Sequence, residues 1–318
     1  MRGHLRWLVP TFAVLTLLLV VDRMVTPRGR TAMREEVLWN ESPSAVTALV
    51  VTQGSDTLRV ERQDGRWWIR APEGKRLLAD QARVRTLLED FLHLRGVHWD
   101  QGHWDRYELT GDKAPQIMVL AGKDTLIQAR AGKTGPDFTR SFLGVPKDST
   151  VYLVRGGWRV RFNPRVSMWR NRTLLDVNVD SVQALRFREG DRSWGVVQTA
   201  AGWQWIGHEG PGPDSAQGRT YLNRSAHLAS SLYADSLDFR TAGLEPPRRT
   251  LEVVLRTGDT LRVLMGNTQG EGADRQVFLG RPGDPTVYVL NEAYVNRYLW
   301  PTPATFAPQS EKKKPQKE

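Results

Sequence analysis

Alternation of apolar and polar residues dominates this chain, and it predicts β-strands separated by short turns. Residues 80–94 differ, because apolar side chains there recur three or four positions apart behind Asp80, which predicts a capped helix that packs on a sheet. Strands, a helix and more strands are typical of an α+β unit with a largely antiparallel sheet. The strands expected before residue 155 are residues 46–52, 57–62, 66–70, 116–120, 125–130, 139–144 and 150–154.

The same order of elements occurs again about 136 residues further along the chain. Residues 142–152 read FLGVPKDSTVY, and residues 278–288 read FLGRPGDPTVY. A repeat of this length is a whole small domain with its own core. The sequence therefore predicts two tandem duplicated β-rich units, residues 44–175 and 176–306, with the second helix near residues 221–234.

Equivalent aromatic residues mark the expected cores of the two copies. The alignment pairs Trp68 with Trp205 and Tyr152 with Tyr288, and we expect these four residues to have a structural role in the repeat cores. Because successive residues of a strand face opposite sides, the neighbouring Trp67 is expected to point the other way.

An apolar segment without charged residues, Trp7–Val21, follows a basic stub at the N-terminus. It predicts an N-terminal transmembrane helix, a signal anchor within residues 1–25, followed by a juxtamembrane linker over residues 26–43. A cleaved signal peptide and a buried helix are the alternatives, and the first lacks a small-x-small cleavage pattern. The arginines after the segment favour a cytoplasmic body, but long domains translocate largely regardless of charge, so we expect the body outside. Residues 307–318 are expected to be a disordered basic tail.

Composition narrows the possible chemistry. The 318 residues include no cysteine, which excludes disulfides, thiolate nucleophiles and cysteine-ligated zinc. The formal net charge of +10 comes mostly from arginines spread along the sequence. Spread positive charge suits a solvated surface or an anionic envelope polymer as partner. Since no basic stripe is evident, we expect no nucleic-acid partner.

Sequence motifs for catalysis are missing or incomplete. Gly132-Lys-Thr134 resembles the end of a phosphate-binding loop, but Ile127 stands where such a loop needs its earlier glycine. The counterpart Gly266-Asn-Thr268 also lacks the lysine, so a glycine turn after a strand is the simpler interpretation. We therefore predict no cofactor, no metal and no enzymatic activity, although a pair of carboxylates distant in sequence stays open as acid and base.

The triplet His-Trp-Asp occurs twice in close succession. Two imidazoles and two carboxylates could bind a divalent metal, and the two indoles could stack on a sugar. Alternatively, the tryptophans cover the end of the helix while the polar residues face water. The second copy has Asp235-Ser-Leu-Asp-Phe239 at this place, which favours the second interpretation. The candidate interaction patch, named the HWD patch below, is His98, Trp99, Asp100, His103, Trp104 and Asp105.

The chain has 12 tryptophans, a large number for its length, and they allow the same two interpretations. They could line a glycan-binding groove, or they could pack in cores and at their edges. Recurrence of Trp68 at Trp205 favours packing, whereas Trp158, Trp169 and Trp194 have no counterpart in the other copy.

Several motifs in order resemble a known family. The motifs are a Val-x-x-Leu strand, a Trp-x-Ile strand, a helix, a Gly-Leu-x-x-Pro turn at residues 243–247, a Thr-Val-Tyr strand and a Trp-Arg-Asn-Arg-Thr-Leu-Leu segment at residues 169–175. Together they resemble domain-of-unknown-function family 4340. The likeness covers roughly residues 44–300. It implies an auxiliary protein of an ABC-type export system, including gliding-motility systems, in the bacterial envelope, and it transfers no catalytic residue.

These observations lead us to expect a non-enzymatic accessory or scaffold protein of the bacterial inner membrane. It would be single-pass with a periplasmic body, and its partner would be an integral membrane protein such as an ABC-type permease. The alternative is a periplasmic protein that binds glycan or cell-wall polymer.

Overall fold

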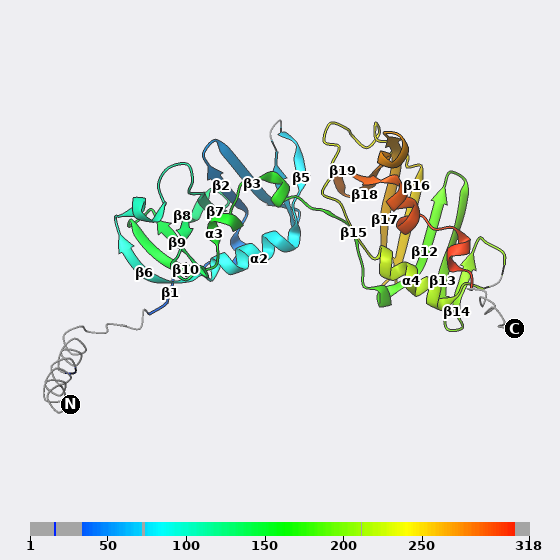
Figure 1. Cartoon of the computed structure of the whole chain (residues 1–318), viewed down its shortest axis with the longest axis horizontal. Helices are drawn as coiled ribbons and strands as arrows, with labels where there is room; N and C mark the ends of the chain where they lie inside the picture. The colour runs from blue at the N-terminus through cyan, green and yellow to red at the C-terminus, as the bar shows by residue number, and fades with distance from the viewer. Residues whose placement is uncertain (1–15, 17–33, 72–73, 211, 309–318) are drawn as a thin grey trace, which may run out of the picture. The chain divides into compact units, whose positions relative to one another are not determined.

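The computed structural model describes Thr16 and residues 34–71, 74–210 and 212–308 (Figure 1). Contacts between residues divide the chain into two compact units, which we describe separately. The first unit comprises residues 1–46, 51–56 and 87–163, and the second comprises residues 47–50, 57–86 and 164–318.

The predicted α+β class with a transmembrane helix is wrong, because the described residues form mainly β-structure. They build three antiparallel sheets of ten, seven and two strands, whereas the two longest helices have only 12 and 11 residues. Tight turns are the physical reason, since they return each strand directly beside the previous one and leave few segments for helices. Asp64 and Gly65, with φ of 51° and 74°, form one such two-residue turn, as their sequence predicts.

The ten-stranded sheet contains the longest run of neighbouring strands. In spatial order these are β1 (Glu36–Val37), β6 (Arg95–Gln101), β10 (Thr150–Arg155), β9 (Arg140–Val145), β8 (Asp124–Thr134), β7 (Gln116–Ala121), β2 (Ala48–Gln53), β3 (Asp56–Gln63), β4 (Arg66–Arg70) and β5 (Arg76–Leu78).

The other two sheets lie in the second unit. The seven-stranded sheet has the order β14 (Gly202–Ile206), β13 (Arg192–Thr199), β12 (Val182–Glu189), β16 (Arg249–Leu255), β17 (Thr260–Gln269), β18 (Gln276–Arg281) and β19 (Asp284–Asn291). The small sheet pairs β11 (Thr173–Asp176) with β15 (His227–Ala229). β11 therefore begins within the Trp-Arg-Asn-Arg-Thr-Leu-Leu segment of residues 169–175.

Strand order repeats along the chain as the sequence repeat predicts. The order β4-β3-β2-β7-β8-β9-β10 matches β14-β13-β12-β16-β17-β18-β19 strand for strand. Beyond these seven strands, Tyr152 pairs with His98, and Tyr288 forms an isolated bridge with Tyr233 at the equivalent place. Each half of the chain therefore builds the same antiparallel order.

Two helices accompany the sheets. The predicted start of α2 (Gln81–Leu92) is confirmed, because the Asp80 carboxylate accepts a hydrogen bond from the Arg83 N–H at 2.9 Å. The second helix, α4 (Ser215–Ser225), begins earlier than predicted, because Asp214 caps it by accepting from the Gln217 N–H at 2.8 Å. The other helical segments are α3 (Trp158–Arg161), α5 (Glu292–Tyr294), the π-helical turn Val295–Leu299 and the 3-10 turns Pro43–Ala45, Trp104–Tyr107, Val166–Met168, Val179–Ser181, Gly272–Asp274 and Pro303–Phe306.

The expected anchor and tail lie outside the described residues. Apart from Thr16, nothing is described before residue 34 or after residue 308, so the rest of the expected anchor, residues 26–33 of the linker and residues 309–318 of the tail lie outside the description. Among the helices that the structure describes, none combines the length and the apolar character needed to cross a bilayer.

Gly132 and Gly266 do not form the expected turns after a strand, since they lie within β8 and β17. A Cβ on Gly132 would lie 2.5 Å from the Tyr107 carbonyl oxygen, and a Cβ on Gly266 would lie 2.1 Å from that of Ala242. Both glycines therefore allow the same close crossing of two backbone segments. Packing, and not phosphate binding, explains the motif in both copies.

Candidate functional site

The HWD patch lies where β6 ends and the chain turns into the 3-10 segment Trp104–Tyr107. Asp100 is its centre, because its carboxylate accepts hydrogen bonds from the Tyr107 hydroxyl at 2.6 Å, from His103 Nδ1 at 3.1 Å and from the Gln101 N–H at 2.7 Å. The bond from Tyr107, followed by that from His103, lowers the pKa of Asp100 to about 2. The same bond to Asp100 raises the pKa of Tyr107.

The other polar residues of the HWD patch have separate partners. His98 is exposed, and its ring lies edge-on to that of Tyr152 with 6.1 Å between centroids. Asp105 accepts a hydrogen bond from the Thr110 hydroxyl at 2.5 Å. Within the ranges that the structure describes, no group of three or more His, Asp or Glu residues could hold a metal. The fold brings Asp100 and His103 together but forms no metal centre with them.

The two indoles of the HWD patch cover a small apolar cluster that includes Leu109 and Phe142. Trp99 lies 5.8 Å from Phe142 between ring centroids, and the Trp104 Nε1–H donates to the Ser149 carbonyl oxygen at 2.9 Å. Both side chains are half-buried. Both indoles therefore pack on this cluster, whereas the covering of the helix end that the sequence comparison favours stays a prediction.

Tryptophans without a counterpart in the other copy are also occupied in packing. Trp158 and Trp169 are 1% and 0% exposed, so neither face is available to a sugar. Trp194 stacks on Phe187 with 4.3 Å between centroids. A flat aromatic platform is what glycan binding would need, so this alternative loses its main support.

The repeat-core residues differ in burial. Trp67 is 7% exposed, whereas Trp68 is half-buried with the Arg76 guanidinium 4.8 Å from its ring centroid, so the structure reverses the expected order of the two. Trp205 is half-buried and packs on the apolar core of the second unit. Tyr152 is half-buried and Tyr288 is fully buried.

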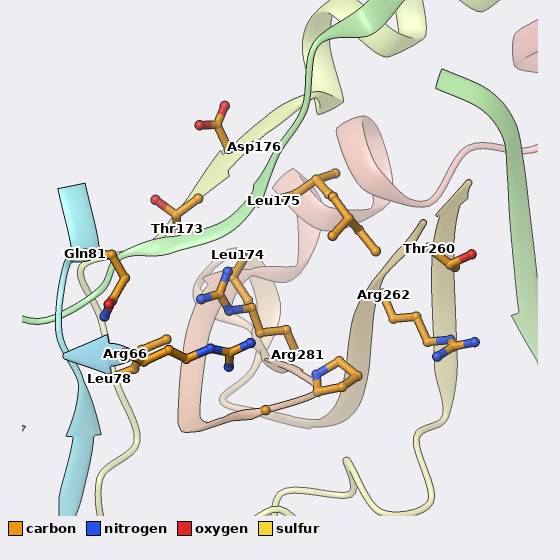
Figure 2. A pocket seen from close by; sticks show the side chains of 13 residues that line it. Arg66, Leu78, Gln81, Thr173, Leu174, Leu175, Asp176, Thr260, Arg262 and Arg281 are labelled. Atoms are coloured by element: carbon orange, nitrogen blue, oxygen red, sulfur yellow. The ribbon is translucent and has the colours of Figure 1, made fainter. Parts of the chain in front are cut away.

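An open pocket of about 400 Å³ in the second unit has a charged lining (Figure 2). Apolar side chains, among them Leu78, Leu174 and Pro282, form part of its wall. Its charged lining residues are Arg66 from β4, Arg262 from β17, Arg281 from β18 and Asp176 from β11.

Three of these charged residues already have partners. Arg281 Nε lies 3.3 Å from Asp284 Oδ2, and Arg262 Nε lies 2.8 Å from Glu252 Oε1. The Asp176 carboxylate pairs with His227 Nδ1 at 2.5 Å instead of with an arginine. No acidic side chain of the described residues lies within ion-pair distance of the fourth, Arg66. The pocket therefore has an excess of positive charge.

A buried polar network lies behind the Arg281 side of this pocket. Tyr288, fully buried, donates from its hydroxyl to Asp284 Oδ2 at 2.7 Å and accepts from Asn171 Nδ2 at 2.7 Å. Burial, followed by the nearby charge of Asp284, raises the pKa of Tyr288. Sequence reasoning missed this network, because 117 residues separate Asn171 from Tyr288 and only the Trp-Arg-Asn-Arg motif hinted at a special role.

The turn between β8 and β9 presents an exposed aromatic residue. Phe138 is 87% exposed and has φ of 58°. The Asp137 carboxylate closes the turn by accepting from the N–H groups of Thr139 and Arg140, each at 3.1 Å. This residue was also missed, since a single phenylalanine in a turn gives no periodic signal.

Comparison of the chain with protein-family models, with characterised proteins and with solved structures found no match. The resemblance to domain-of-unknown-function family 4340 stays a prediction.

Proposed function

We propose that the protein is a non-enzymatic accessory or scaffold protein of the bacterial envelope, and that Phe138 anchors the contact with its partner. The partner is an integral membrane protein such as an ABC-type permease, as the sequence resemblance implies. The observation that carries the proposal is the exposure of the Phe138 side chain, 87%, in a turn that does not use it.

Backbone geometry makes this phenylalanine unfavourable for the fold. A φ of 58° is disfavoured for a bulky side chain and is better tolerated by Asn or Asp. The hydrogen bonds of the turn come from the Asp137 carboxylate and from the backbone, where Phe138 N–H donates to the Gly135 carbonyl oxygen at 3.2 Å. An aromatic ring is therefore present without any contribution to the turn.

The second copy provides an internal comparison. The alignment of Phe142 with Phe278 places Asp274 at the position of Phe138. β17 and β18 are joined there without an aromatic residue. Exposed aromatic residues that a fold does not need are typical of binding hot spots, where a ring fills a pocket on the partner. This comparison supports a contact made by the first copy alone.

Photo-crosslinking in native membranes tests the partner contact. A benzophenone amino acid replaces Phe138 in the full-length protein, and the matched control carries it at Asp274, the equivalent position in the second copy. We expect a covalent adduct with an integral membrane protein from position 138 and at least a tenfold lower yield from position 274. Equal yields from the two positions, or no adduct from position 138, would contradict the proposal.

A further inference from the structure

We infer that the arginine pocket of the second unit binds a small organic anion, a molecule that carries a phosphate or carboxylate group on an apolar body. The inference goes beyond the partner contact at Phe138 and uses none of its residues. It starts from the positions of Arg66 and Arg281.

Two arginines on different strands line this pocket. Figure 2 shows the side chains of Arg66 and Arg281 directed toward each other, with that of Arg262 pointing away. Gly283 follows Arg281 in the β18–β19 turn, and a Cβ placed on it would lie 3.3 Å from Arg66 Nη1, so Arg66 reaches this turn. Two positive charges that line one pocket repel each other, and an anion bound between them would reduce the repulsion.

The existing ion pairs leave the donors of both groups available. Arg281 is bound to Asp284 through Nε, and its two terminal Nη groups have no partner among the described residues, so they can bind a ligand. Arg66 has no acidic partner among the residues that the structure describes. Guanidinium groups with free Nη atoms form two parallel hydrogen bonds with a phosphate or a carboxylate.

The fold itself does not require arginine at these places. The alignment of the two copies pairs Arg262 with Ile127 and Arg281 with Val145. At the place of Arg66 the second copy has Trp203. The same strands therefore form with apolar side chains in the equivalent positions.

Pocket size and wall chemistry define the class of ligand. A volume of about 400 Å³ is larger than one phosphate ion needs and falls within the usual range for small-molecule sites. Leu78, Leu174 and Pro282 would contact an apolar body attached to the anionic group. Burial of the ligand's apolar surface against this wall would make the free energy of binding more favourable.

Isothermal titration of the full-length protein with phenyl phosphate tests this inference. The key variant is Arg66→Gln, which removes a guanidinium without breaking an ion pair. The control is Arg192→Gln, which removes the same charge from an exposed position of the same unit. A lost charge-assisted hydrogen bond contributes about 1.5–3 kcal/mol, so we expect affinity to fall at least tenfold in Arg66→Gln and to change less than twofold in Arg192→Gln.

Two further probes separate charge from apolar contact. Inorganic phosphate should bind more weakly than phenyl phosphate, and neutral phenol should give no measurable heat. Any of three results would overturn the inference: no heat with millimolar phenyl phosphate, unchanged affinity in Arg66→Gln, or equal affinity for phenol and phenyl phosphate.

Discussion

Replacing Tyr288 with phenylalanine isolates one buried hydroxyl group of the second unit. The ring stays in place, so packing is retained, while the hydrogen bonds to Asp284 and Asn171 are lost. Asp284 is 2% exposed and keeps Arg281 Nε at 3.3 Å, so its carboxylate is left with fewer donors and no access to water. The variant therefore leaves a buried, partly unsatisfied acceptor.

The expected loss follows from the charge of that acceptor. A hydrogen bond to a charged group contributes about 1.5–3 kcal/mol, and leaving its buried acceptor unsatisfied adds to the loss. We expect Tyr288→Phe to lower the free energy of unfolding by about 2–3 kcal/mol. The matched control is Tyr152→Phe at the equivalent, half-buried position of the first copy, where a change within about 0.5 kcal/mol is expected.

Hydrogen exchange followed by mass spectrometry reads the two copies separately in one sample. A loss of about 2 kcal/mol raises the exchange rate of the protected amides about 30-fold. We expect this acceleration in peptides from β18 and β19 of Tyr288→Phe, and unchanged rates in peptides from β9 and β10. If Tyr288→Phe and Tyr152→Phe accelerate exchange equally, the buried network does not stabilise the second unit.

Two other variants test features that the two-copy comparison singles out. The low pKa of the Asp100 carboxyl group, about 2 in the folded state, contributes stability that is lost as the pH falls through that value. Asp100→Asn should therefore lose less stability than the wild type between about pH 4 and 2. Melting temperatures measured across this range, with Asp105→Asn as control, check this prediction. In Gly266→Ala the new methyl group would lie 2.1 Å from the Ala242 carbonyl oxygen, so the free energy of unfolding, measured in urea, should fall by about 1–3 kcal/mol. The control is Gly212→Ala, whose methyl group would have no atom within 4 Å and whose stability should match the wild type.

Local sequence signals predicted the elements that neighbouring residues control. The turn at Asp64-Gly65 and the cap at Asp80 depend on contacts within a few residues, and both appear as expected. The second helix was placed too late, because Gly218 weakens the helical signal of residues 215–225 and the cap at Asp214 was overlooked. Fold class was wrong because each copy has only one long helix beside a sheet of seven or more strands, so strands outweigh helices.

Features that depend on tertiary contacts were not predictable from spacing. Alternation could show that Trp67 and Trp68 face opposite sides, but only the packed sheet decides that Trp67 lies inside. Arg66 and Arg281 are far apart in sequence and carry no motif, so only the folded chain shows that they line one pocket. The candidate site therefore came from the structure, whereas the tryptophans of the HWD patch pack on the apolar cluster of Leu109 and Phe142.

Comparing the copies separates what the fold requires from what has diverged. Gly132 and Gly266 allow the same backbone crossing in the two copies. Leu109 and Leu244 also occupy equivalent places, since each packs against a glycine of a later strand in its own copy. By contrast, the exposed ring of Phe138 and the guanidinium of Arg66 each occur in one copy only. Substitutions at these two positions should therefore impair separate interactions, Phe138→Asp the partner contact and Arg66→Gln anion binding, while the repeated sheets remain folded.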